Sequence, residues 1–262
     1  MIWWFSGTGN SWEVAQRATD VLNCPLRAMA AEVGTDAQLA VDGCNEIGFV
    51  FPVYGWDIPK AVNAFLAQLP PYPTAAAPHV FAILTCGDDI GHTDKQLRKA
   101  LARKGWPLHA VYSLRMRNTY VCLPGFDKDS TEVETAKHAE AMSVLTGSII
   151  PRIRRHEGST AADIHPGAFA WAKTHVLGVL FNKLLTTPRP FRADAACTSC
   201  GTCARCCPLG NISIKKGKGN KPAWGTHCTL CLACYHSCPH HAVEYGRFTK
   251  GKGQVKVTAR RF

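Results

Sequence analysis

The stretch Met1–Glu13, MIWWFSGTGNSWE, indicates how the first half of the chain is built. A short apolar run, Ile2–Phe5, leads directly into a loop of small residues with hydroxyl and amide groups, Ser6–Ser11. Apolar residues then recur at helical spacing as far as Leu22. The pattern predicts a buried strand, a tight polar loop and an amphipathic helix, with Ile2–Phe5 as the central strand of a sheet.

The same alternation continues over the first 125 residues. Further strands are predicted at Pro25–Ala30, Ile47–Val53, His79–Thr85 and Leu108–Leu114. Helical spacing lies between them at Pro59–Leu69 and Thr93–Lys104, and a longer helix is predicted at Thr131–Arg155. Strands that alternate with helices imply a parallel sheet with helices on both faces. We therefore expect an α/β, doubly wound domain over residues 1–155.

The loop Ser6–Ser11 has the composition of an anion site. Its backbone N–H groups, its hydroxyls and the N-terminus of the following helix can surround a phosphate. It lacks the Lys-Ser/Thr pair of an ATP-binding loop, and Trp12 replaces the third glycine of a dinucleotide fingerprint. The sequence thus predicts a monophosphate site without a basic residue, and a simple polar helix cap is the alternative.

Two further loops follow predicted strands: Phe51–Pro59, FPVYGWDIP, and Thr85–Asp89, TCGDD. Because the carboxyl ends of parallel strands meet at one edge, all three loops should lie together. The three loops resemble the FMN-binding loops of flavodoxins. The resemblance implies that Tyr54 and Trp56 stack on the flavin ring and that Gly55 presents a backbone group near its N5. The residues expected to bind FMN are Ser6, Gly7, Thr8, Gly9, Asn10, Ser11, Pro52, Val53, Tyr54, Gly55, Trp56, Thr85, Cys86, Gly87 and Asp88.

Nine of the thirteen cysteines lie between Cys197 and Cys238. Two segments align there, CTSCGTCARCCP and CTLCLACYHSCP, and both fit the spacing C-x2-C-x2-C-x3-C-P. They form an internal repeat of about thirty residues. An odd count of cysteines, without a secretory leader, argues against a disulfide framework and favours metal binding.

Three thiolates at successive C-x2-C spacing can hold three corners of an iron–sulfur cube, and a remote thiolate supplies the fourth. In this bacterial arrangement the fourth cysteine of each run ligates the other cluster. One [4Fe–4S] cluster is therefore assigned to Cys197, Cys200, Cys203 and Cys238, and the other to Cys228, Cys231, Cys234 and Cys207. Structural zinc is the disfavoured alternative, and Cys206 is expected to be a spare thiol. The unit resembles the two-cluster bacterial ferredoxins.

The order of these motifs resembles a family of flavodoxin–ferredoxin fusion proteins from anaerobic bacteria and archaea. The resemblance implies a flavodoxin-like domain (1–155), a helical segment and linker (156–190), and a two-[4Fe–4S] ferredoxin domain with a basic tail (191–262). The expected function is electron transfer between the clusters and FMN, as a redox relay or reductase component in anaerobic metabolism. The alternative is a flavin-dependent reductase of a small substrate, fed by the clusters, with a pocket that involves Trp56, Asp57, Asn118 and Tyr120. Whether the chain is an enzyme or an electron carrier stays open.

The formal net charge of +11 is concentrated in the cysteine-rich part. Residues 191–262 hold 12 basic and 2 acidic residues, whereas residues 1–190 hold 18 and 17. We expect a redox partner with an acidic surface that contacts Lys215–Lys221, and a solvated hairpin tip is the alternative interpretation of that stretch. Nucleic acid is disfavoured because aromatic residues do not alternate with the basic ones.

The segment Pro166–Leu185 is predicted to be a helix with a wide apolar side. We expect this side to pack on the first domain or to dock the second, and a role at a membrane surface is the alternative. No apolar run reaches the length of a transmembrane helix. A cytoplasmic location is the resulting expectation.

Overall fold

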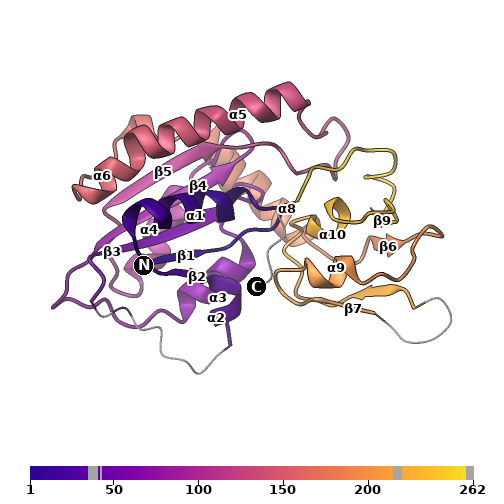
Figure 1. The fold of residues 1–262 in the computed structure, drawn as a ribbon, viewed down its shortest axis with the longest axis horizontal. Helices are drawn as coiled ribbons and strands as arrows, with labels where there is room; N and C mark the ends of the chain where they lie inside the picture. The colour runs from indigo at the N-terminus through magenta and orange to yellow at the C-terminus, as the bar shows by residue number, and fades with distance from the viewer. Residues whose placement is uncertain (35–40, 42, 215–219, 258–262) are drawn as a thin grey trace.

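In the computed structural model, a five-stranded parallel sheet organises the first half of the chain (Figure 1). The structure describes residues 1–34, 41, 43–214 and 220–257. The strands are β1 (Ile2–Trp4), β2 (Leu26–Ala28), β3 (Glu46–Pro52), β4 (His79–Cys86) and β5 (Ala110–Arg115). They lie in the order β2-β1-β3-β4-β5, which is the order of flavodoxin-like doubly wound sheets. The predicted α/β class is confirmed, although β3 and not β1 occupies the centre.

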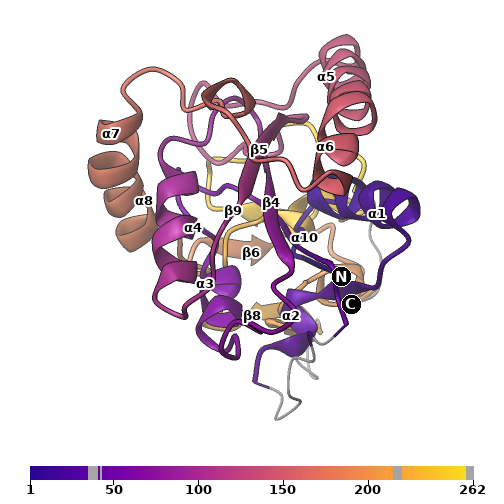
Figure 2. The ribbon, with the colours of Figure 1, turned by 90° about the vertical axis from the view of Figure 1, so that its left-hand side faces the viewer.

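Helices cover both faces of this sheet (Figure 2). The side chains of β1 point alternately to the two faces and show why. Trp3 and Phe5 pack with α3 (Lys60–Ala67) and α4 (Thr93–Ala102) on one face. Ile2 and Trp4 pack on the other face, where α1 (Asn10–Leu22) and a long helix lie. The long helix consists of α5 (Thr131–Val144), η1 (Leu145–Ile149) and α6 (Ile150–Arg154). A strand that is apolar on both sides is required where helices bury both faces.

Two short elements complete this part of the chain. The helix α2 (Met29–Glu32) follows β2 directly, and the 3₁₀ turn η2 (Ala161–Asp163) follows the long helix. The turn is closed by a capping box in which Thr160 and Asp163 bond each other's backbone N–H groups.

The cysteine-rich part is built from two copies of one strand–helix–strand unit. The first copy contains β6 (Phe191–Ala193), α9 (Thr202–Arg205) and β7 (Ile212–Ile214), and the second contains β8 (Pro222–Trp224), α10 (Ala233–His236) and β9 (Val243–Tyr245). β6 pairs with β9 and β7 pairs with β8, both antiparallel. Each small sheet thus takes one strand from each copy, so neither copy forms its sheet alone.

Equivalent positions in the two copies also share left-handed backbone conformations. Ser199 and Leu230 hold equivalent places in the two copies and have φ of 61° and 55°. Gly201 and Leu232, also equivalent, have φ of 74° and 60°. Left-handed conformations are unfavourable for leucine and serine, and such strain is typical of ligand-binding segments. Both loops therefore hold their cysteines on the same strained backbone.

The segment after β5 joins the two parts of the chain. His236 in α10 donates from Nε2 to the carbonyl oxygen of Thr119 at 2.8 Å. Lys252 donates from Nζ to the carbonyl oxygen of Leu123 at 2.7 Å. Cys122 is buried in the core of the cysteine-rich part. These contacts fix the cysteine loops against the carboxyl edge of the parallel sheet.

The helix predicted at Pro166–Leu185 begins at Ala170 and consists of α7 (Ala170–Ala172), η3 (Lys173–Gly178) and α8 (Val179–Leu184). Its small residues Thr174 and Gly178 are buried, whereas most of its large apolar residues are exposed. The expectation that its apolar side packs in a core is therefore wrong. Among the described residues, no helix combines the length and apolar character needed to cross a bilayer.

Candidate functional site

A cavity of about 530 Å³ lies at the carboxyl ends of β1 and β3, where the strand order reverses. Doubly wound sheets bind their ligands at this point. All three predicted loops reach it and contribute Ser6, Gly7, Thr8, Asn10, Ser11, Pro52, Val53, Tyr54, Thr85, Cys86 and Gly87. The remaining wall comes from Arg117–Tyr120 and Leu230–Leu232. The structure thus brings most of the predicted FMN residues to one cavity.

The loop Ser6–Ser11 is held by its own hydroxyl groups. Ser6 Oγ accepts the backbone N–H of Gly9 at 3.0 Å, and Ser11 Oγ lies 2.7 Å from Thr85 Oγ1. Gly9 does not line the cavity; it has φ of 109° and precedes the first residue of α1. The buried loop therefore presents backbone and hydroxyl groups at a helix N-terminus, as an anion site requires.

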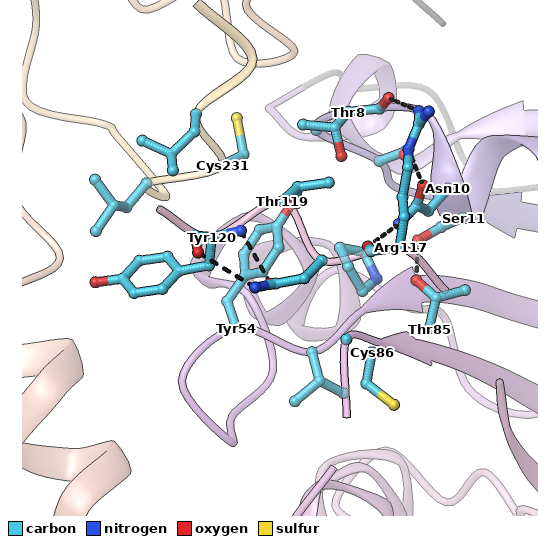
Figure 3. A pocket seen from close by; sticks show the side chains of 18 residues that line it. Thr8, Asn10, Ser11, Tyr54, Thr85, Cys86, Arg117, Thr119, Tyr120 and Cys231 are labelled. Carbon is cyan, nitrogen blue, oxygen red and sulfur yellow. Dashed lines mark hydrogen bonds between the residues drawn. The ribbon is translucent and has the colours of Figure 1, made fainter. Parts of the chain in front are cut away.

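Arg117 lies beside this loop, although the sequence predicted a site without a basic residue (Figure 3). Its Nε donates to Asn10 Oδ1 at 3.2 Å, and its Nη2 donates to the carbonyl oxygen of Thr8 at 3.4 Å. Asn10 Nδ2 in turn donates to the carbonyl oxygen of Arg117 at 3.1 Å. The prediction was wrong on this point. The available signal was that Arg117 follows a fifth strand whose carboxyl end lies at the same edge.

Tyr54 and Trp56 take different places, although both were expected to stack on one ring. Gly55 and Trp56, with φ of 57° and 55°, form a tight turn that brings Tyr54 and Asp57 into mutual backbone hydrogen bonds. Tyr54 lines the cavity, and burial raises the pKa of its hydroxyl well above the usual value. Trp56 does not line it; its Nε1 donates to Asp89 Oδ1 at 2.8 Å.

A second cavity, of about 880 Å³, adjoins the first and shares Tyr54, Asn118 and Tyr120 with it. Gly55, Trp56 and Asp88 of the predicted set lie here. Its wall is mostly apolar and includes Leu123, Phe126, Phe181 and Leu230. Asp57 lines neither cavity. The apolar wall of the second cavity, with its few polar groups, is the lining typical of sites for small organic molecules.

Cys86 lines both cavities and is buried. Burial raises the pKa of its thiol to about 12, and the neighbouring carboxylates of Asp89 and Asp88 add to this effect. The thiol is therefore neutral near pH 7 and is not an activated nucleophile.

The predicted cluster ligands lie around two separate cavities in the cysteine-rich part. One, of about 350 Å³, is lined by Cys207, Cys228, Cys231 and Cys234. The other, of about 310 Å³, is lined by Cys197, Cys200, Cys203 and Cys238. Each cavity takes three cysteines from one copy and the fourth from the other, as the cross-braced assignment expects. Cys206 is buried outside both, and its Sγ lies 3.4 Å from the carbonyl oxygen of Cys203.

Backbone N–H groups are directed at several of these sulfurs. Asn211 N donates to Cys207 Sγ and its counterpart Ala242 N donates to Cys238 Sγ, both at 3.3 Å. Hydrogen bonds of this kind are made to the sulfurs of metal-bound thiolates. Within the described residues, no three His, Cys, Asp or Glu side chains gather as one metal ion would require. Four thiols around each cavity, with backbone N–H donors, fit a thiolate-bound cluster that is larger than a single metal ion. The assignment to [4Fe–4S] clusters stays a prediction.

Cys231 connects the two kinds of site. It lines the cysteine cavity and also, together with Leu230 and Leu232, the cavity at the edge of the parallel sheet. Its Cβ lies against Gly7 in the Ser6–Ser11 loop. A group bound among the four cysteines would therefore be separated from a ligand in the first cavity by little more than this residue. The predicted contact surface Lys215–Lys221 lies mostly outside the described residues.

The sequence matches no protein-family model and no curated relative. Its structure is similar to the Trp repressor binding protein from Bacillus subtilis (13% identity, 56% of this chain and 96% of that one, TM-score 0.39). It is also similar to an apo NADH:FMN oxidoreductase, EmoB (18% identity, 64% of this chain and 95% of that one, TM-score 0.41). A third match, rubredoxin oxygen:oxidoreductase from Desulfovibrio gigas (13%, TM-score 0.38), covers 59% of this chain and 36% of that one.

Proposed function

We propose that this chain is an electron-transfer protein that binds FMN in the first cavity and a [4Fe–4S] cluster in each cysteine cavity. The observation that carries the proposal is the position of Cys231, which lines both the first cavity and a cysteine cavity. Clusters supply one-electron steps and FMN supplies one- or two-electron steps. A protein that holds both at adjoining sites can interconvert single electrons and electron pairs.

The residues of the first cavity have distinct tasks in this proposal. The backbone and hydroxyl groups of Ser6–Ser11 bind the FMN phosphate, and the guanidinium of Arg117 balances its charge. Tyr54 supplies an aromatic surface for the flavin ring. Leu230 and Leu232 exclude water between the flavin site and the cysteine loop.

The cysteine repeat supplies rigidity and two equivalent sites. Because each small sheet contains one strand from each copy, the two cavities cannot move apart without breaking β6–β9 or β7–β8. The excess of basic residues in 191–262 favours an acidic protein as external donor or acceptor.

The test is anaerobic purification and reconstitution of the full chain, with analysis of iron, sulfide and flavin, followed by redox titration monitored by EPR. We expect one FMN and about eight irons per chain, with two cubane signals. A chain that binds no flavin after reconstitution, or that shows fewer than two cubane signals, contradicts the proposal.

A second candidate is a flavin-dependent reductase whose substrate binds in the second cavity. The observation in its favour is that this cavity adjoins the first and is lined by Trp56, whose indole is fixed by a hydrogen bond to Asp89. Under this candidate, Trp56→Ala and Phe181→Ala should change turnover of a small acceptor while FMN binding is unchanged. A pure carrier would reduce acceptor proteins at rates that these substitutions do not alter.

A further inference from the structure

The helix from Ala170 to Leu184 packs on the protein through small residues and through an ion pair of Lys173 with Asp89. Thr174 Oγ1 accepts the backbone N–H of His92 at 2.8 Å. A Cβ added to Gly178 would lie 2.6 Å from the carbonyl oxygen of Gly55. Close approach of this kind needs glycine, so the inner face of the helix is fixed by the turn that follows β3.

The outer face carries the large apolar side chains. Phe169 is 82% exposed, Trp171 and Leu184 are each 63% exposed, and Leu180 is 55% exposed. Val176, Leu177 and Val179 are also exposed. Figure 2 shows this helix at the periphery of the molecule, with no other helix or strand beyond it. So many exposed large apolar side chains in one short helical segment indicate a site of interaction and not a solvated face.

The charges around this face identify its partner. No Asp or Glu occurs between Asp163 and Asp194, whereas Lys183, Arg189 and Arg192 are exposed. Asp89 and Asp57 contact the helix at Lys173 and Asn182, so they lie on the side that faces the protein. Aromatic residues at one end of an apolar helix face, with cations and no acids in the same segment, are typical of helices that lie in the plane of a bilayer. A second copy of this chain would bring like charges together, in a protein with a formal net charge of +11.

We propose that the outer face of this helix binds the surface of a membrane that contains anionic lipids. The helix lies in the interface with Trp171, Leu177, Leu180 and Leu184 among the acyl chains, and Lys183 and Arg189 reach the anionic headgroups. The proposal does not depend on the cofactors, because the face lies outside both cavities except at Phe181. It would place the second cavity next to the membrane.

The test is co-flotation of the full chain with vesicles of phosphatidylcholine alone or mixed with phosphatidylglycerol. We expect binding only to the mixed vesicles and release at high salt. Leu180→Glu should lower the partition coefficient about tenfold, since one leucine side chain carries that order of transfer free energy. Val133→Glu, at a residue of α5 that is 43% exposed, is the matched control and should leave binding unchanged.

A second pair of variants tests the charges. Lys183→Glu should weaken binding to mixed vesicles, whereas Lys104→Glu, at an exposed site after α4, should not. Because Leu180 and Lys183 are exposed, these variants should unfold at the same temperature as the parent chain. Equal binding to both vesicle types, or binding that Leu180→Glu leaves intact, overturns the proposal. A third result would also overturn it: the parent chain binds no vesicles but forms a dimer in sedimentation experiments, and Leu180→Glu dissociates that dimer.

Discussion

Cys231 lies so close to Gly7 that a methyl group on Gly7 would stand 2.4 Å from the cysteine Cβ. The hydroxyl oxygen of Tyr54 would stand 2.7 Å from the same methyl group. Residues from the loop after β1, from the turn after β3 and from the second cysteine loop thus meet at one glycine, although more than 200 positions separate two of them. This contact makes the Ser6–Ser11 loop and the second cysteine loop mechanically dependent on each other.

Gly7→Ala should disturb both sites together. The added methyl group cannot be accommodated without movement of the Cys231 backbone, so we expect a loss of about 1–3 kcal/mol in the free energy of unfolding. FMN affinity should fall, and the EPR signal of the cluster assigned to Cys231 should change. Gly147→Ala is the control, because no atom lies within 4 Å of the added Cβ. A fall in FMN affinity with an unaltered cluster signal would contradict the proposed coupling.

Arg117→Gln should weaken binding of FMN much more than binding of riboflavin. Arg117 fixes Asn10 and Thr8 and supplies the positive charge nearest the loop, so its removal acts on the phosphate and not on the ring. We expect the FMN dissociation constant to rise about 10–100-fold, the range that a lost charge-assisted hydrogen bond gives. Fluorescence titration with both ligands measures it.

The matched control is Arg115→Gln, which removes an exposed arginine that pairs with Glu140 at 3.3 Å. Its effect on FMN should be small, because surface ion pairs contribute little. If Arg117→Gln weakened FMN and riboflavin equally, the loop would not be the phosphate site.

Cys207→Ser should damage the cluster assigned to the second cysteine loop, although Cys207 belongs to the first. Cys207 lines the cavity formed with Cys228, Cys231 and Cys234. About four of the eight expected irons should be lost, and the remaining cubane signal should belong to the other cavity. Cys206→Ser, at the adjacent thiol that lines neither cavity, should keep both. Damage confined to the other cluster would refute the cross-braced assignment.

The sequence predicted the sheet and the edge at which the loops meet, because both follow from local patterns. The apolar run Ile2–Phe5 and the small residues of Ser6–Ser11 leave few choices of structure. The C-x2-C spacing groups three cysteines in each copy, whereas the assignment of the fourth rests on the bacterial two-cluster arrangement. Arg117 was missed because it lies in an irregular segment, where no periodicity marks which side chain turns towards the loop.

The exposed helix was misjudged for a related physical reason. An apolar side predicts burial, but it does not say what will cover it. Thr174 and Gly178 were the informative residues, because small side chains at helical spacing allow the backbone of a neighbour to approach. The different places of Tyr54 and Trp56 were likewise inaccessible, because they depend on a turn with two left-handed residues and on Asp89.

His79 should make the stability of the chain depend on pH. Its ring is stacked between His109 and His156, with centroids 5.0 Å away on each side, and its Nε2 has no hydrogen-bond partner among the described residues. The pKa of His79 is lowered from 6.5 to about 4: burial is the largest cause, the neighbouring histidines add to it, and Glu46 opposes them.

Between pH 6.5 and about 4 the unfolded chain binds a proton at His79 that the folded chain does not. The free energy of unfolding therefore falls as the pH is lowered through this window, by about 1–3 kcal/mol. Urea unfolding at a series of pH values measures the slope. His79→Gln should remove this part of the slope, whereas His175→Gln, at an exposed ring, should keep it. A slope that persists unchanged in His79→Gln would assign the dependence to other groups.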